Sequence, residues 1–229
     1  MRVETLELLR CPAAHAPSPL VTIATAREGD RLTDGTLGCP ICGAQYELEH
    51  GVVHFGESGV QYFMLDGETD PTRVAALIAL TEPGARVGLC GIAGPMAATM
   101  DLAFGSRVLA INASSLEPPM LSLEDLDRVE ASLEASISAS WPDAIELPVR
   151  GALPLADGAL DALVVDDAHV SLLADAARVV RAGGRVLAPV HAPVPAGCRE
   201  LARDAEQWVA EVTDAVSAPV ALTSRRRTP

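Results

Sequence analysis

The chain has 229 residues, of which 49% are hydrophobic but only 3% aromatic, so it can bury one large aliphatic core or two small ones. Its formal net charge of −14 argues against nucleic acid as a partner, because binding to phosphates requires basic surface. No apolar run reaches the roughly 18 residues of a membrane-spanning helix. The first residues, MRVETLELLRCP, lack the charged and then apolar pattern of a secretion signal, so we expect a cytoplasmic protein.

The chain has five cysteines, which are Cys11, Cys39, Cys42, Cys90 and Cys198. An odd number without a secretion signal predicts reduced thiols rather than a disulfide framework. Three of the five lie within the first 42 residues, and this clustering indicates a metal site.

A zinc knuckle is indicated by the turn Cys39-Pro40-Ile41-Cys42-Gly43, which directs two thiolates at one ion while the glycine allows the tight backbone behind them. Tetrahedral zinc needs four ligands, and Cys11 is the obvious third. His15 follows Cys11 at a Cys-x3-His spacing that can close the tetrahedron. The predicted ligands of a structural zinc ion are therefore Cys11, His15, Cys39 and Cys42.

Two alternatives to this ligand set stay open. In one, His15 is an exposed loop residue, and the site holds no metal or only three protein ligands. In the other, His50 or His54 supplies the fourth ligand. Both of these histidines flank the apparent strand Gly51–Phe55, and we expect them on its surface.

The segments LELLRCP and LGCPICGAQYELEHGVVHF resemble the Trm112-like zinc-ribbon family, which has a Leu-rich start, two cysteine knuckles and a final apolar strand after a glycine. The resemblance covers residues 1–56. It departs from the family at the first knuckle, where Ala14 replaces the usual second cysteine. It implies a small module that stabilises or activates methyltransferases by covering their exposed apolar surface. A ribbon of this size has little core, so its metal would supply much of its folding free energy.

The middle of the chain predicts the opening unit of a doubly wound sheet. Residues 57–69 are polar and contain glycine, and we interpret them as a linker. Asp70-Pro71 indicates a helix start, with a capping carboxylate before a proline at the first helical position. A strand at Arg86–Cys90, a helix at Pro95–Phe104 and a strand at Arg107–Asn112 then form a βαβ unit.

The rest of the chain continues this alternation. A capping box at Ser122 and Asp125 predicts a surface helix. The further elements expected are a strand at Ile145–Val149, a strand at Leu160–Val165, a helix at Ser171–Ala182 closed by Gly183-Gly184, a strand at Arg185–Val190 and an amphipathic helix at Cys198–Val216. Little sequence then remains for a closing hairpin.

The segment from Leu153 to Val190 resembles class I S-adenosylmethionine-dependent methyltransferases, and the matching residues are Leu153-Pro154, Asp157-Gly158, Leu160-Asp161 and Arg178–Gly184. The resemblance covers residues 70–223. Together with the ribbon it implies an α/β fold with a small N-terminal zinc ribbon at residues 1–56, a linker at 57–69 and a domain at 70–229. That domain is expected to be a doubly wound, Rossmann-like methyltransferase fold truncated at its C-terminal end.

In that family the first strand ends in an acid and a glycine-rich turn that approaches the methionine part of the cofactor. Here Leu89 replaces the acid, while Ala93 and Pro95 replace glycines; alanine adds a methyl group and proline removes a donor. The second strand of the family ends in an acid that binds the ribose hydroxyls. Asn112 replaces it and can bind a hydroxyl only without charge assistance.

The third strand is followed in the family by an acid or amide near the adenine, whereas Arg150-Gly151-Ala152 has no acid. Substitutions at all three places predict that S-adenosylmethionine binding is lost or altered. The residues that remain as cofactor-binding candidates are Gly91, Gly94 and Asn112.

The sequence contains few residues that could be catalytic, and their support is weak. Asp166 and Asp167 follow the fourth strand, where class I enzymes place polar residues that face the substrate, and His169 could act as a base. The alternative, which we prefer, is an acidic cluster at a helix N-terminus, favoured by the helix dipole, with His169 exposed.

Three functions are therefore under comparison. The first is a non-catalytic methyltransferase-like subunit that binds another protein or a second copy, with Leu89 and Met96 filling the cofactor space. The second is an active S-adenosylmethionine-dependent methyltransferase with its ribbon activator fused in cis, which requires an open cavity. The third is a ribbon adaptor that activates a separate methyltransferase in trans, which predicts an exposed apolar strand edge near Val52–Phe55.

Overall fold

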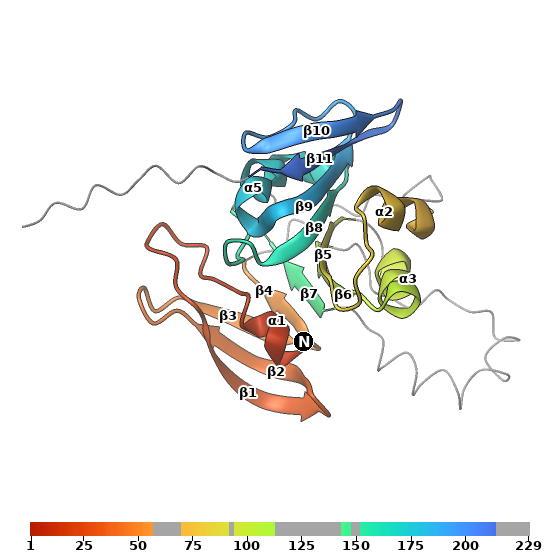
Figure 1. Cartoon of the computed structure of the whole chain (residues 1–229). Coiled ribbons are helices and arrows are strands. Elements are labelled where there is room, and N and C mark those ends of the chain that lie inside the picture. Colours follow the sequence, from red (N-terminus) through yellow and green to blue (C-terminus); the bar gives the residue numbers. More distant parts are fainter. Residues whose placement is uncertain (57–69, 92–93, 113–142, 148–151, 214–229) are drawn as a thin grey trace, which may run out of the picture.

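The computed structural model describes residues 1–56, 70–91, 94–112, 143–147 and 152–213. One sheet of 11 strands contains the described strands in the order β1-β2-β3-β4-β7-β6-β5-β8-β9-β11-β10 (Figure 1). Its centre, β7-β6-β5-β8-β9, is parallel and has the strand order of a doubly wound α/β fold. The predicted fold class is confirmed.

The N-terminal part forms one short helix and four strands: α1 (Val3–Leu6), β1 (Val21–Glu28), β2 (Arg31–Gly38), β3 (Gln45–Glu49) and β4 (Val52–His54). These strands are antiparallel to their neighbours. β4 also pairs in parallel with β7 (Asp143–Glu146), so the sheet of the N-terminal part continues without a break into the parallel strands. The edge at Val52–Phe55, which the adaptor hypothesis expects to be exposed, is thus covered by the chain's own β7.

The parallel centre is built from α2 (Pro71–Leu77), β5 (Arg86–Cys90), α3 (Gly94–Phe104), β6 (Arg107–Ile111) and β8 (Leu160–Val165). The capping carboxylate of Asp70 accepts a hydrogen bond from the backbone N–H of Thr72 at 2.8 Å, so the predicted helix start is confirmed. The strands predicted at Arg86–Cys90 and Leu160–Val165 are also confirmed, because both are apolar runs buried on both faces.

The helix expected at Ser171–Ala182 is wrong in its bounds. A 3-10 helix η1 (Asp167–Asp175) is followed by one turn of α-helix, α5 (Ala176–Val179), and β9 (Val180–Pro189) begins at once. Gly184 lies inside β9, where a Cβ atom would come within 2.5 Å of the Asp161 carbonyl oxygen. This glycine therefore permits close approach of β9 to β8 and does not terminate a helix.

The helix expected at Cys198–Val216 is also wrong. The chain there forms a hairpin of β10 (Cys198–Arg203) and β11 (Gln207–Val212), and β11 pairs with β9. Its turn is set by Asp204, whose carboxylate accepts hydrogen bonds from the backbone N–H groups of Glu206 and Gln207. The closing hairpin is present, and the expected truncation at the C-terminal end is corrected.

Trp208 anchors this hairpin. Its side chain is fully buried, and its indole N–H donates to the Ala192 carbonyl at 2.8 Å. We expect Trp208→Phe to lower the free energy of unfolding by about 1–2 kcal/mol, because the change leaves a buried carbonyl unpaired and shrinks a packed side chain. Urea unfolding followed by circular dichroism measures this loss. A loss below about 0.3 kcal/mol would show that the hairpin is not anchored at this residue.

Two apolar clusters lie on opposite faces of the parallel strands. Helices α2 and α3 cover one face, whereas η1 and α5 cover the other (Figure 1). The cluster under η1 and α5 also contains residues of the N-terminal part, such as Leu9, Val53 and Phe55. The N-terminal part and the parallel strands therefore share one core. The helix predicted after Ser122 lies outside the described residues.

Asp143, the first residue of β7, fixes the start of the chain to the parallel sheet. Its carboxylate is 1% exposed. It accepts hydrogen bonds from the backbone N–H of Arg2 at 2.9 Å, from the Arg31 guanidinium at 3.0 Å and from the Thr5 hydroxyl. A buried negative charge is thereby held between two arginines, since the Arg2 guanidinium lies 3.8 Å away.

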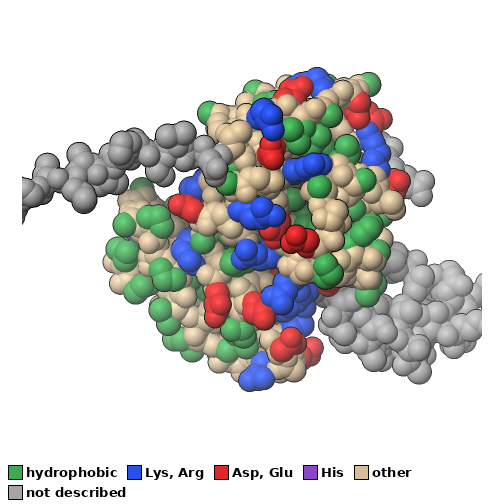
Figure 2. Space-filling view, in the orientation of Figure 1, with side chains coloured by type: hydrophobic (Ala, Val, Ile, Leu, Met, Phe, Trp, Pro, Cys, Tyr) green, Lys and Arg blue, Asp and Glu red, His purple; other side chains and the backbone are tan. Residues whose placement is uncertain are grey.

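None of the described helices has both the length and the apolar character needed to cross a membrane. On the face drawn in Figure 2, acidic and arginine side chains are interspersed rather than separated into patches of one sign. This distribution is not the continuous basic stripe that a phosphate backbone requires.

Candidate metal centre and ligand site

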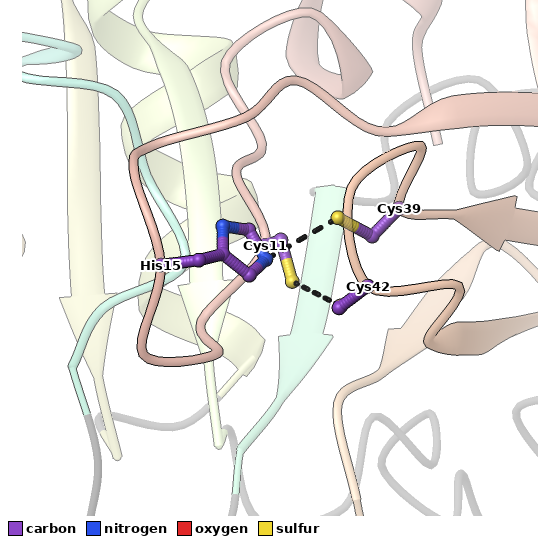
Figure 3. Close-up of side chains that lie close together, drawn as sticks. All are labelled: Cys11, His15, Cys39 and Cys42. Carbon is purple, nitrogen blue, oxygen red and sulfur yellow. Dashed lines mark hydrogen bonds between the residues drawn. The ribbon is translucent and has the colours of Figure 1, made fainter.

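The four predicted metal ligands come together between the two knuckles of the ribbon (Figure 3). Cys39 and Cys42 lie in the turn between β2 and β3, while Cys11 and His15 lie in the segment after α1. Their ligand atoms all lie within 4.8 Å of one another. The Cys11 and Cys42 sulfurs are 3.7 Å apart, and His15 Nε2 is 3.4 Å from the Cys39 sulfur.

His15 is oriented for this role by the backbone carbonyl of the next residue, Ala16. Its Nδ1 lies 2.6 Å from the Ala16 carbonyl oxygen, which can only accept, so Nδ1 carries the proton. Nε2 then faces the thiols and is the nitrogen that a metal would bind, which is how metal-binding histidines are commonly positioned. His54 instead contacts Glu146 at 3.0 Å, and His50 lies in the turn before β4. Neither belongs to the cluster.

These residues fit a zinc ion in chemistry and spacing. Ligands at about 2.3 Å from a tetrahedral ion are about 3.8 Å apart, close to the separations observed. Burial opposes ionisation of Cys39, but hydrogen bonds from the backbone N–H groups of Cys42 and Ile41 lower its thiol pKa to about 6. Tyr46 Oη lies 3.3 Å from the Cys11 sulfur, and this contact helps to fix the position of the sulfur.

A second group of polar residues lies at the carboxyl ends of β5 and β8, the edge where doubly wound sheets bind their ligands. Gly91 follows β5 with a φ of +72°, and Asp166 follows β8. Asp166 Oδ1 is 2.6 Å from His169 Nδ1 and also caps the start of η1. Here sequence and structure agree that the acids sit at a helix start, but His169 is largely buried rather than exposed.

The Asp166–His169 pair occupies the space directly over Gly91. A Cβ atom built on Gly91 would lie 2.0 Å from Asp166 Oδ2 and 2.5 Å from His169 Nδ1. Leu89 and Met96, which the first hypothesis expects in this space, instead belong to the core beneath α2 and α3. Side chains do stand over the turn, but they are a carboxylate and an imidazole.

Asn112 is used inside the protein. It follows β6 with a φ of +50° and is 5% exposed. Its side-chain oxygen accepts a hydrogen bond from the backbone N–H of Leu147 at 2.6 Å. The residue therefore ties the end of β6 to the end of β7, while Gly94 begins α3.

The remaining candidates lie apart from this pair. Asp167 is exposed and lies 3.5 Å from His191 Nδ1, which follows β9 and which the sequence gave no reason to select. Cys90 is fully buried, and both its burial and the Asp166 charge raise the pKa of its thiol, so it stays protonated. A cavity of about 210 Å³ lies at the opposite, amino ends of β5, β8 and β9, and one of about 420 Å³ lies between α1, the turn from β1 to β2 and Arg107 at the start of β6.

No protein-family model matches this sequence, and no curated protein matches it. Among solved structures, a putative methyltransferase from Bacillus halodurans is similar at 17% identity over 52% of this chain and 49% of that one, with a TM-score of 0.35. TrmN from Thermus thermophilus is similar at 19% identity over 65% of this chain and 50% of that one, with a TM-score of 0.43. The chain spans about half the length of these two structures. A chain in the complex of the Haloferax volcanii Trm112 methyltransferase activator and the putative methyltransferase is similar at 13% identity over 62% of this chain and 93% of that one, with a TM-score of 0.39.

Proposed function

We propose that this protein is a methyltransferase-like subunit that carries its own structural zinc ribbon and serves as a non-catalytic assembly or partner-binding protein. The observation that carries this proposal is the placement of Asp166 and His169 against Gly91. In this proposal residues 1–56 form the ribbon and residues 70–229 the methyltransferase-like domain. The partner is a protein or a second copy in the cytoplasm.

The packing at Gly91 opposes S-adenosylmethionine. In the family that the sequence resembles, the glycine turn after the first strand lets the backbone approach the methionine part of the cofactor. Here the Asp166 carboxylate and the His169 ring lie against Gly91, and a Cβ atom there would come within 2.0 Å of Asp166 Oδ2, so the space for that approach is occupied. Asn112, the remaining candidate for the ribose, already accepts from the Leu147 N–H.

Zinc has a structural role in this proposal. Cys11, His15, Cys39 and Cys42 would hold the ion and so join the two knuckles of a module with little core. Because β4 pairs with β7, the ribbon would cover a sheet edge of its own chain. That pairing speaks against an adaptor that works in trans through the same edge.

An active S-adenosylmethionine-dependent methyltransferase with a fused ribbon is the second candidate. One observation favours it: Asp166 orients the His169 ring through Nδ1, which leaves Nε2 as a base at the edge where such sheets bind ligands. In this alternative Gly91, Gly94 and Asn112 would contact the cofactor after a rearrangement of the pair.

Calorimetric titration of the zinc-loaded protein with S-adenosylmethionine and S-adenosylhomocysteine separates the two. We expect no heat of binding and no rise in the thermal midpoint at millimolar ligand. Micromolar binding that is lost in Asn112→Ala and kept in Asp167→Ala would overturn the non-catalytic proposal. Asp167 is the matched control because it is exposed and neighbours the pair without contacting Gly91.

A further inference from the structure

We infer that metal occupancy of the ribbon sets the position of the Asp166–His169 pair, through a hydrogen-bonded connection that runs from Cys11 to η1. The inference rests on the zinc site of the proposed function. It goes beyond that function because it couples the metal site to the Asp166–His169 pair through contacts among the described residues.

The first step is a short strand pairing directly before Cys11. The Arg10 N–H donates to the Pro154 carbonyl at 2.8 Å, and the Ala156 N–H donates to the Leu8 carbonyl at 2.8 Å. Between them Leu9 and Leu155 form an antiparallel bridge and are both fully buried. Cys11 therefore cannot shift along the chain axis without moving the segment Leu153–Ala156.

The second step joins that segment to the end of η1. Arg178 donates to the Leu153 carbonyl at 2.8 Å and to the Leu155 carbonyl at 2.6 Å. Asp175, the last residue of η1, accepts from the Leu153 N–H at 2.8 Å and pairs with Arg178 at 2.5 Å. Charge assistance makes these bonds strong, so the segment and Asp175 move as one body.

The third step is η1 itself. It spans nine residues, from Asp167 to Asp175, and its capping residue is Asp166. A 3-10 helix has poorer hydrogen-bond geometry than an α-helix, so η1 is displaced or unwound as a whole at a low cost when its last residue moves. A shift at Asp175 is therefore passed to Asp166 and His169, which stand over Gly91.

Metal binding would supply the two states that such coupling needs. In the loaded protein Cys11 would be tied to Cys39 and Cys42, and this tie would hold the neighbouring Leu9–Leu155 bridge in place. Without zinc, the loop from Cys11 to His15 would lose its tie to the second knuckle and keep weaker contacts, which include the Cys11 N–H bond to the Ser18 carbonyl, the Tyr46 hydroxyl at the Cys11 sulfur and the bridge between Arg10 and Pro19. Local opening then spreads to Leu153–Ala156 and onward to η1.

Amide hydrogen exchange of the full chain, with and without chelator, tests this connection. Metal content is measured first, because a protein that takes up no zinc contradicts the zinc proposal, whereas a zinc-loaded protein allows the connection to be judged separately. We expect chelation to speed exchange about tenfold or more in peptides covering residues 8–11, 153–157 and 167–179. Exchange in the hairpin β10–β11 should stay unchanged. Acceleration confined to residues 1–50, or spread equally over the hairpin, would overturn the inference.

Two arginine substitutions sharpen the test. In Arg178→Gln the effect of chelation should largely stop at residue 157, because the second step loses the charge-assisted Arg178 bonds and keeps only the Leu153 N–H bond to Asp175. Arg181→Gln is the matched control, since Arg181 pairs with Asp161 at 2.5 Å and lies outside the connection. As an independent readout, the His169 imidazole nitrogen resonances should shift on chelation in wild type and Arg181→Gln but not in Arg178→Gln. If both variants respond alike, the connection does not pass through Arg178.

Discussion

Replacing Cys39 with serine should abolish stoichiometric zinc binding and lower the thermal midpoint by about 10 °C or more. A serine hydroxyl does not ionise at neutral pH, so the site loses one of its thiolates and most of its affinity. For a chain of this size each kcal/mol lost shifts the midpoint by about 2–4 °C, and a loss of several kcal/mol is expected from a structural metal. Elemental analysis gives the zinc content, and differential scanning calorimetry gives the midpoint.

Cys198→Ser is the control for this experiment. Cys198 is a partly exposed thiol at the start of β10, outside the cluster, so its replacement should leave both zinc content and midpoint within about 2 °C of wild type. His15→Ala tests the fourth ligand in the same way. Full zinc binding with an unchanged midpoint in His15→Ala would show that the ion has only three protein ligands.

Asp143→Ala should be the most damaging single change outside the metal site. It removes a buried carboxylate, so the Arg31 guanidinium, which is 15% exposed, loses the Asp143 oxygen at 3.0 Å, while the Arg2 guanidinium keeps its pair with Asp101 at 3.1 Å. Breaking a buried pair from one side costs about 3–5 kcal/mol because an uncompensated charge stays buried. Urea unfolding of the zinc-loaded protein measures the difference in free energy.

Glu206→Ala is the matched control, because it removes a carboxylate that also pairs with an arginine but is 76% exposed. Surface pairs contribute about 0–1 kcal/mol, so little change is expected. Asp143→Asn should fall between the two, since it keeps one acceptor oxygen, which can serve the Arg2 N–H, while it loses the charge and the oxygen that accepts from the Thr5 hydroxyl. Equal effects of Asp143→Ala and Glu206→Ala would show that Asp143 does not fix the ribbon to the sheet.

Sequence patterns predicted the structure correctly where residues a few positions apart determine it. The strand β5 and the capped start of α2 were predictable because an apolar run and an Asp-Pro pair act within a few residues. The clustering of the four candidate ligands was predictable for the same reason, since the knuckle turn and the Cys-x3-His spacing each bring two donors together with little help from the rest of the chain.

Patterns failed where a distant strand decides the structure. Residues 198–212 show helical spacing of apolar side chains, yet pairing with β9 makes them a hairpin in which Trp208 and Val209 face opposite cores. The position of Asp166 over Gly91 depends on β5 and β8 being neighbours, about 75 residues apart in the chain. The sequence around Asp143 does not indicate its role, because the partners of its carboxylate, Arg2 and Arg31, lie more than 100 residues earlier.

The pairing of β4 with β7 has a consequence for the order in which the molecule can form during synthesis. The edge of β4 and the side chain of Leu9 find their partners at residues 144–146 and at Leu155, about 90 and 145 residues later. Until those residues leave the ribosome, the early strands have an open edge and an incomplete core. We therefore expect the nascent ribbon to load its metal early but to remain exposed to aggregation, and the whole chain to reach its native state slowly, as one unit.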